Sequence, residues 1–94
     1  MRVRIYLYAT LRELAGGKRI VEVEVPEGAT VLEALLEADR KIPGLAGEIL
    51  DSGRVREGYK VMVSGRDVDF EGGPGARRLR EGEEIHVFPP VAGG

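Results

Sequence analysis

Hydrophobic and polar residues alternate near the beginning of the chain and predict two strands. Over residues 2–8 the apolar positions are Val3, Ile5 and Leu7, and the intervening positions are Arg2, Arg4, Tyr6 and Tyr8. This period of two is typical of a strand with one buried face. Residues 21–25 repeat the pattern and stop at Pro26. The short separation predicts an antiparallel hairpin, with one helical turn over 10–14 and a chain reversal at Gly16 and Gly17.

The clearest helix signal begins at Thr30. Thr30 and Glu33 have the spacing of a capping box, in which each side chain bonds the backbone N–H of the other residue. An apolar stripe at helical spacing follows, made of Val31, Leu32, Leu35, Leu36, Ala38 and Ile42. Pro43 and Gly44 end this helix. Residues 45–58 predict a short helical or irregular link.

Two more strands are predicted in the second half, one over residues 59–63 and the last over residues 85–88. Between them we expect a turn at 64–67, no regular structure at 71–75, where glycine is abundant, and an inward-pointing Leu79. The order is strand, strand, helix, strand, strand. With the first and last strands as parallel neighbours at the centre of a mixed sheet, this order predicts a β-grasp. It is an α+β fold with four to five strands and one main helix across them.

Composition limits the function classes. Ninety-four residues make one domain, and 43% hydrophobic with 32% charged residues is typical of a soluble globular protein. No apolar run approaches the ~20 residues that span a membrane, and no signal-peptide core is present. We therefore expect a cytoplasmic protein that binds no membrane. A net charge of −2 argues against nucleic-acid binding.

Charged and missing residue types add two expectations. Arg77, Arg78 and Arg80 form a basic cluster, but glutamates follow within 81–84, so a solvated loop of mixed charge is favoured over a phosphate site. Asn and Gln are absent while the charged fraction is high, which is a thermophile signature. A GC-rich genome would also explain the excess of Arg over Lys.

The body of the chain offers no catalytic constellation. The sequence has no cysteine, which excludes disulfides, thiolate metal sites and thiol chemistry on the chain itself. His86 is the one histidine, and its alternation with Ile85 and Val87 favours a strand-surface residue over a catalytic base. No acidic cluster has a metal-loop pattern, and the glycines at 72–75 lack the Lys-Ser/Thr of a phosphate loop. We expect no metal site and no catalyst.

Candidate chemistry lies at the end of the chain. Pro89 and Pro90 favour an extended rod and are expected to hold the last residues away from the body. Gly93 and Gly94 have no side chains to obstruct a narrow tunnel. Residues 1–88 would thus form one domain, and residues 89–94 a flexible tail that carries the Gly94 carboxylate into another protein's active site. ATP-dependent adenylation would activate that carboxylate for attack by sulfide or by an amine, and composition does not choose between them.

Both ends of the chain resemble a known family. The segment from Val3 to Gly16, with its Ile-Tyr-Leu-Tyr-Ala and Leu-Arg-Glu-Leu-Ala-Gly runs, and the ending Phe-Pro-Pro-Val-Ala-Gly-Gly are similar to the small subunit of molybdopterin synthase, MoaD. Thr30, Val31 and Glu33 match the family's helix start. Within the wider MoaD/ThiS family of ubiquitin-like sulfur carriers, the thiamine-pathway carriers (ThiS) usually lack the proline pair, and ubiquitin has an arginine-rich tail instead. The resemblance spans the whole chain.

The resemblance implies a non-catalytic, ubiquitin-like sulfur carrier with no bound cofactor. A MoeB-like enzyme would use ATP to adenylate Gly94, and a sulfur donor enzyme would help convert it to a thiocarboxylate. The tail would then enter a MoaE-like large subunit, in a heterotetramer, where a pterin precursor receives the sulfur. Gly93 would permit threading, and the partner would also contact Ala92, Val91, Pro90 and Pro89. Phe88 with Tyr8 would form part of a docking patch, with Arg12 beside it. The alternative is that both rings are ordinary aromatic strand residues with no role in docking.

Two segments depart from the compact members of that family. Residues 45–58 and 66–80 are longer, and extra loops near the last strand would alter which partner is accepted. Related carriers serve tRNA thiolation, and some modify proteins through isopeptide bonds. The carrier class is therefore a firmer expectation than the molybdopterin pathway.

Overall fold

The computed structural model describes residues 1–91. Its centre is a five-stranded mixed sheet in the order β2-β1-β7-β5-β6. The main strands are β1 (Arg2–Leu7), β2 (Ile20–Glu24), β5 (Lys60–Val63) and β7 (Glu84–Phe88). Strands β1 and β7 run parallel at the centre, with Ile5 opposite Ile85, and the other pairs are antiparallel. The β-grasp prediction is confirmed.

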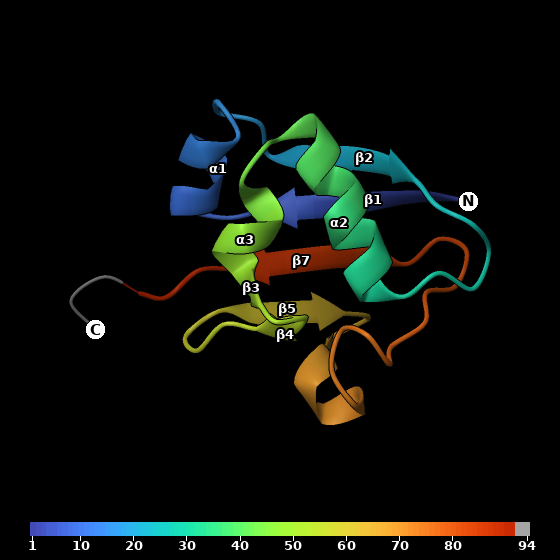
Figure 1. Cartoon of the computed structure of the whole chain (residues 1–94). Helices are drawn as coiled ribbons and strands as arrows, with labels where there is room; N and C mark the ends of the chain where they lie inside the picture. Colours follow the sequence, from blue (N-terminus) through green and yellow to red (C-terminus); the bar gives the residue numbers. More distant parts are fainter. Residues whose placement is uncertain (92–94) are drawn as a thin grey trace.

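Within residues 1–91 three α-helices accompany the sheet: α1 (Thr10–Leu14), α2 (Val31–Lys41) and α3 (Leu45–Ile49). Helices α2 and α3 cover one face of the sheet, whereas none of the helices in residues 1–91 lies over the opposite face (Figure 1). The predicted capping box is present, since Thr30 Oγ1 accepts from Glu33 N at 3.2 Å and Glu33 Oε1 accepts from Thr30 N at 3.1 Å. It fixes where α2 begins.

The core lies between the sheet and these helices. The inward side chains of the strands meet the apolar stripe of α2 and α3, as the alternation at residues 2–8 predicts. The largest fully buried side chains include Ile5, Leu7, Leu11, Leu35, Leu45, Ile49 and Ile85. Because every second residue of β1 and β7 is used here, the intervening residues are all placed on the uncovered face.

The structure corrects the expectation of a turn over residues 64–67. Ser64 and Gly65 alone make the turn, with φ of 51° and 76°, and Arg66–Asp67 form a fifth strand, β6, paired with β5. Two central residues with positive φ are typical of a tight hairpin turn, whose twist matches that of the flanking strands. The hairpin was missed because Ser-Gly is a weaker signal than Asn-Gly or Asp-Gly.

Both long segments contain regular structure. Residues 45–58 form α3 and a small hairpin of β3 (Leu50–Asp51) and β4 (Arg54–Val55). Residues 66–80 begin with β6 and a 3₁₀ helix, η1 (Val68–Glu71). The rest of this segment forms turns and passes beside the N-terminal end of α2. There Val31 N donates to Arg77 O at 2.9 Å and Leu79 N to Ala29 O at 2.8 Å. Leu79 is buried, as predicted.

Arg77 fastens this segment to the body, which corrects its interpretation as part of a solvated loop. Its guanidinium pairs with Glu71 at 3.2 Å and with Glu83 at 2.7 Å, and its side chain is only 13% exposed. The bonds from Arg77, aided by the backbone N–H of Arg80 and the hydroxyl of Ser64, lower the pKa of Glu83 to about 2. Charged hydrogen bonds of this kind hold 66–80 in a fixed place.

Candidate functional site: an aromatic surface at the base of the C-terminal segment

Four rings form a row on the uncovered face of the sheet. Tyr6 stacks on His86 with centroids 4.5 Å apart, and Tyr8 stacks on Phe88 with centroids 4.3 Å apart. The Tyr8 hydroxyl and His86 Nδ1 share a hydrogen bond of 2.8 Å, which joins the two pairs. We call these four residues the aromatic row. It follows from the parallel register of β1 and β7, which sets Tyr6 opposite His86.

The predicted docking residues Tyr8, Phe88 and Arg12 lie together at one end of this row. The Arg12 guanidinium carbon is 5.6 Å from the centroid of the Tyr8 ring, within the range of a cation–π contact. Arg12 Nε also donates to Leu7 O at 3.0 Å, so the side chain is fixed beside the ring. The contact geometry therefore agrees with the predicted patch, and its role in partner binding stays a prediction.

Pro90 lies against the loop before β5, and the expectation that the proline pair holds the last residues away from the body stays a prediction. A Cβ atom on Gly58 would be 2.9 Å from Pro90 Cγ, so a side chain there would displace the proline. Gly58 also has φ of +89°. This close approach fixes the direction of the chain beyond Phe88 and needs a glycine.

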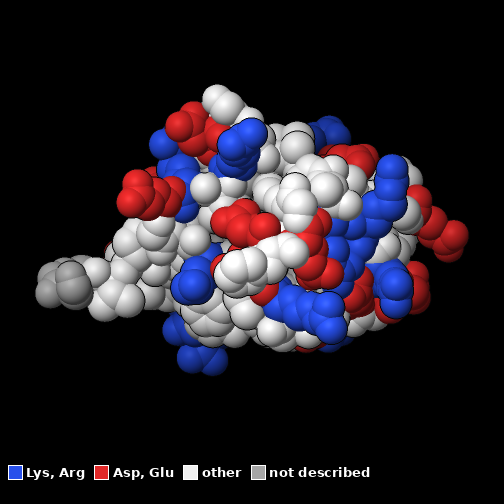
Figure 2. Space-filling view, turned by 90° about the horizontal axis from the view of Figure 1, so that it is seen from below, with Lys and Arg blue, Asp and Glu red and all other residues white. Residues whose placement is uncertain are grey.

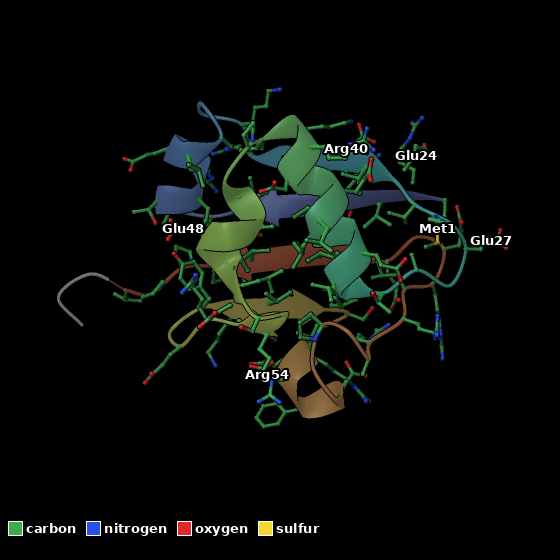
Figure 3. All side chains as sticks on the ribbon, viewed as in Figure 1. Met1, Glu24, Glu27, Arg40, Glu48 and Arg54 are labelled. Carbon is green, nitrogen blue, oxygen red and sulfur yellow. The ribbon has the colours of Figure 1, made fainter. Side chains whose placement is uncertain are left out.

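The same loop is anchored by Tyr59, whose hydroxyl donates to Glu48 of α3, labelled in Figure 3. Burial of the phenol, with the carboxylate as acceptor, raises the pKa of Tyr59 to about 12. The phenol therefore keeps its proton at neutral pH and keeps donating. Helix α3 thus supports the loop on which Pro90 rests.

Val91 is the last residue that the structure describes, and its side chain is 83% exposed. Pro89 and Pro90 precede it, directly after β7 ends at Phe88. The remaining predicted site residues, Ala92, Gly93 and Gly94, lie outside the described residues. The structure therefore shows the base of the proposed tail and the surface beside it.

Sequence reasoning missed two parts of this surface. Tyr6 and His86 belong to the aromatic row, but the sequence indicated only a surface position for His86. The parallel register of β1 and β7, which sets Tyr6 opposite His86, is the signal that would have paired them. Phe70, 89% exposed on η1, borders a hollow that also includes Lys60 and Met62 of β5. Lys60 is opposite Phe88, and Met62 is opposite His86, so this hollow adjoins the aromatic row. No sequence pattern predicts where η1 places Phe70.

No group of three or more His, Asp or Glu side chains within residues 1–91 is placed to hold a metal ion. Among the helices of the described part, none has the length and hydrophobicity to cross a bilayer. The aromatic row and the base of the C-terminal segment remain the strongest candidate site.

Comparison with known proteins places this geometry in a family. Residues 5–94 match the model of the ThiS family. Small archaeal modifier protein 3 of Haloferax volcanii is 37% identical over 94 residues, covering 100% of both chains. A solved chain from the Amycolatopsis orientalis BexX/CysO complex is 29% identical with a TM-score of 0.85, covering 98% of this chain and 99% of that one.

A further solved structure is the putative molybdopterin converting factor, subunit 1, of Pyrococcus furiosus. It is 28% identical with a TM-score of 0.74, and the match covers 97% of this chain and 99% of that one. The members of the matched family, the modifier protein of Haloferax volcanii among them, are small ubiquitin-like carrier or modifier proteins, not catalysts. The match over almost the whole sequence, together with the β-grasp fold, shows that the chain belongs to the ThiS family of ubiquitin-like sulfur carriers and modifiers.

Proposed function

We propose that this chain is a carrier whose Gly94 carboxylate is activated by one protein and used by another. The observation that carries the proposal is the continuity of the aromatic row with the segment leading to Gly94. Phe88 ends the central strand β7 beside Tyr8, and Pro90 is seated on Gly58 two residues later. A partner that docks on the rings therefore receives the C-terminal segment at a fixed point.

The chemistry is acyl activation. A carboxylate is a poor acyl donor because its oxygen leaves poorly. Attack of the Gly94 carboxylate on the α-phosphate of ATP gives an acyl-adenylate and releases diphosphate. Attack of sulfide on the acyl carbon then expels AMP and leaves a thiocarboxylate. The activating enzyme, MoeB-like in its class, supplies the ATP site, and the carrier supplies the acyl group and the docking surface.

The first candidate destination is the pterin precursor of molybdopterin. In that role the chain would be the small subunit of the synthase, and a MoaE-like large subunit would receive its C-terminal segment in a heterotetramer. Support comes from the Phe-Pro-Pro-Val-Ala-Gly-Gly ending and from the likeness to the Pyrococcus furiosus protein named a putative molybdopterin converting factor subunit.

The second candidate destination is a lysine of another protein. An amine that attacks the activated Gly94 carbonyl gives an isopeptide bond, and the chain would then act as a modifier. The full-length, 37% identical relative from Haloferax volcanii is named a small archaeal modifier protein, which gives this alternative comparable support.

Mass spectrometry of the protein produced with and without its activating enzyme and sulfur donor tests these proposals. Replacement of the carboxylate hydroxyl oxygen by sulfur adds about 16 Da, and the absence of cysteine confines thiol-specific alkylation to the C-terminal peptide. Met oxidation adds nearly the same mass, so the alkylated peptide is the deciding product.

An alkylatable C-terminal peptide that appears only with the activating system supports sulfur carriage, and transfer to a pterin by a MoaE-like partner supports the first destination. If Gly94 is found joined to lysines of other proteins and no thiocarboxylate is detected at any stage, the chain is a protein modifier and not a sulfur carrier. A Gly94 that is never adenylated would overturn the carrier proposal.

A further inference from the structure

A second feature lies at the opposite end of the sheet from Phe88. A pocket of about 510 Å³ is lined by residues of the β5–β6 hairpin and of the 77–83 stretch. Its lining includes four arginines and two glutamates: Arg66, Arg77, Arg78, Arg80, Glu71 and Glu83. Figure 2, which views the molecule from below, shows Lys and Arg side chains gathered on one part of this face, with Asp and Glu around them.

Arg77 takes up both carboxylates of the pocket. Glu71 Oε1 accepts from its Nε at 3.2 Å, and Glu83 accepts from Nη1 and Nη2 at 3.0 and 2.7 Å. The two carboxylates are therefore occupied by a single guanidinium, which is largely buried. The other arginines of the pocket are left to interact with something else.

Arg66, Arg78 and Arg80 form no ion pair with any carboxylate of residues 1–91, and all three are exposed. One side chain is nevertheless positioned, because Arg78 Nη1 donates to Gly28 O at 2.7 Å. Four positive and two negative charges leave the pocket with an excess of two positive charges, on a protein whose net charge is −2. An anion would neutralise this local excess.

We propose that this pocket binds a compact phosphate-bearing anion of the diphosphate type, held by Arg66, Arg78 and Arg80. Guanidinium groups present paired N–H donors that match phosphate oxygens. Arg77 is fixed by its ion pairs with Glu71 and Glu83 and forms one side of the pocket, beside the three exposed arginines. The oxygens of the bound anion accept hydrogen bonds from the free N–H groups of the three exposed arginines. The contacts of Arg77 with its two glutamates need not change.

The borders of the pocket favour a small anion over a nucleic-acid backbone. A nucleic acid needs a basic stripe that follows many phosphates. Here Glu81 and Glu84 lie with Arg2 and Arg4 around the adjoining hollow, so the excess of positive charge ends within a short distance. The positive area is therefore local.

The pocket and the aromatic row are separate sites, although the hollow beside Phe70 shares Arg66 and Glu71 with the pocket. Glu83 and Ser64 adjoin the first residue of β7 and the last of β5, whereas Phe88 is the last residue of β7 (Figure 1). The four residue steps from Glu84 to Phe88 correspond to about 13 Å of strand. An anion can thus be bound while a partner holds the C-terminal segment, and the inference goes beyond the carrier function.

Titration of the isotopically labelled protein with inorganic diphosphate, at constant ionic strength, tests the proposal by amide NMR. The shifts are expected at residues 64–66 and 77–83. The double variant R66Q/R80Q removes two exposed guanidiniums and spares Arg77 and Arg78, so it is expected to keep the wild-type fold. It should weaken diphosphate binding at least tenfold.

The matched control is R19Q/R40Q, which changes the net charge equally; Arg40 is labelled on α2 in Figure 3 and lies outside the pocket lining. It should bind diphosphate within twofold of the wild type. Absence of pocket shifts, or equal loss in both double variants, would overturn the proposal. A single-stranded oligonucleotide that binds more tightly than diphosphate, with shifts extending beyond the pocket, would overturn it in favour of nucleic-acid binding.

Discussion

The ring of Phe88 lies on the ring of Tyr8, with centroids 4.3 Å apart and planes inclined by 15°. One ring follows the end of β1 and the other ends β7, so the stack bridges the two parallel central strands just before the chain leaves the sheet. On the proposed function, partner binding and the stability of the strand pair depend on this same contact. Measurements of unfolding and of partner binding distinguish these two effects.

A double-mutant cycle with Tyr8→Ala and Phe88→Ala should give a coupling free energy of about 0.5–1.5 kcal/mol in unfolding, since stacked aromatic pairs contribute this much beyond burial. Urea unfolding measures it. Phe88→Ala should also weaken binding of the activating enzyme. The control is Leu36→Ala, which removes an exposed apolar side chain from α2, on the covered side of the sheet. A coupling of zero would show that the rings are merely adjacent.

Removal of Gly94, or addition of one residue after it, should abolish adenylation and leave the thermal unfolding midpoint unchanged. The reacting carboxylate moves by about 3.5 Å per residue, far enough to miss a positioned phosphate. The assay is ATP-dependent formation of the C-terminal adenylate by mass spectrometry. Equal adenylation of the shortened chain would refute the role of Gly94.

Gly58→Ala should redirect the chain beyond Phe88, because the new Cβ would be 2.9 Å from Pro90 Cγ. The matched control is Gly65→Ala, which also has positive φ, +76°, but has no atom within 4 Å of the added Cβ. Both variants should lose about 1 kcal/mol of stability through backbone strain. Amide shifts of Val91 and slower activation are expected for Gly58→Ala alone, and matching behaviour of the two variants would argue against the Pro90 contact.

Glu83 should make stability depend on pH in the acid range. Its pKa is held at about 2 by Arg77, below the ordinary 4.5, so the unfolded chain binds the proton more readily. The resulting stabilisation is complete above about pH 5 and is lost as the pH falls toward 2. Glu83→Gln should cost about 2 kcal/mol at pH 7 and flatten this part of the profile.

Denaturant unfolding at a series of pH values measures the effect. Glu81→Gln, on the same turn, is the control, because no hydrogen bond or ion pair of Glu81 is found within the described chain. If both variants show the same pH profile, the Arg77–Glu83 pair does not fasten the segment.

Regular alternation predicted the fold, because each main strand has one buried face and the helix has a clear stripe. Tyr8, Phe88 and Arg12 could be placed near one another once β1 and β7 were taken as parallel neighbours. What failed depended on pairings that alternation does not predict. The strand at Arg66–Asp67 has only two residues and forms because Ser64 and Gly65 turn it back onto β5, and Arg77 is buried because Glu71 and Glu83 both pair with it. A two-residue strand is too short to show alternation, and sequence proximity does not say which charged residues will pair.

The parallel pairing of β1 with β7 also has a consequence for synthesis. Residue 4 lies beside residue 84, so the middle of the sheet stays open until β7 has been made. Before that moment β1 and β5 each expose an unpaired edge, and a chain truncated before β7 would be prone to aggregate. Pairing across 80 residues is also slow to nucleate, because the loop must close before the contact forms. Tyr8 and Phe88 therefore come together only after β7 has been made, so on the proposed function a chain without β7 would lack the docking surface and could not compete for an activating enzyme.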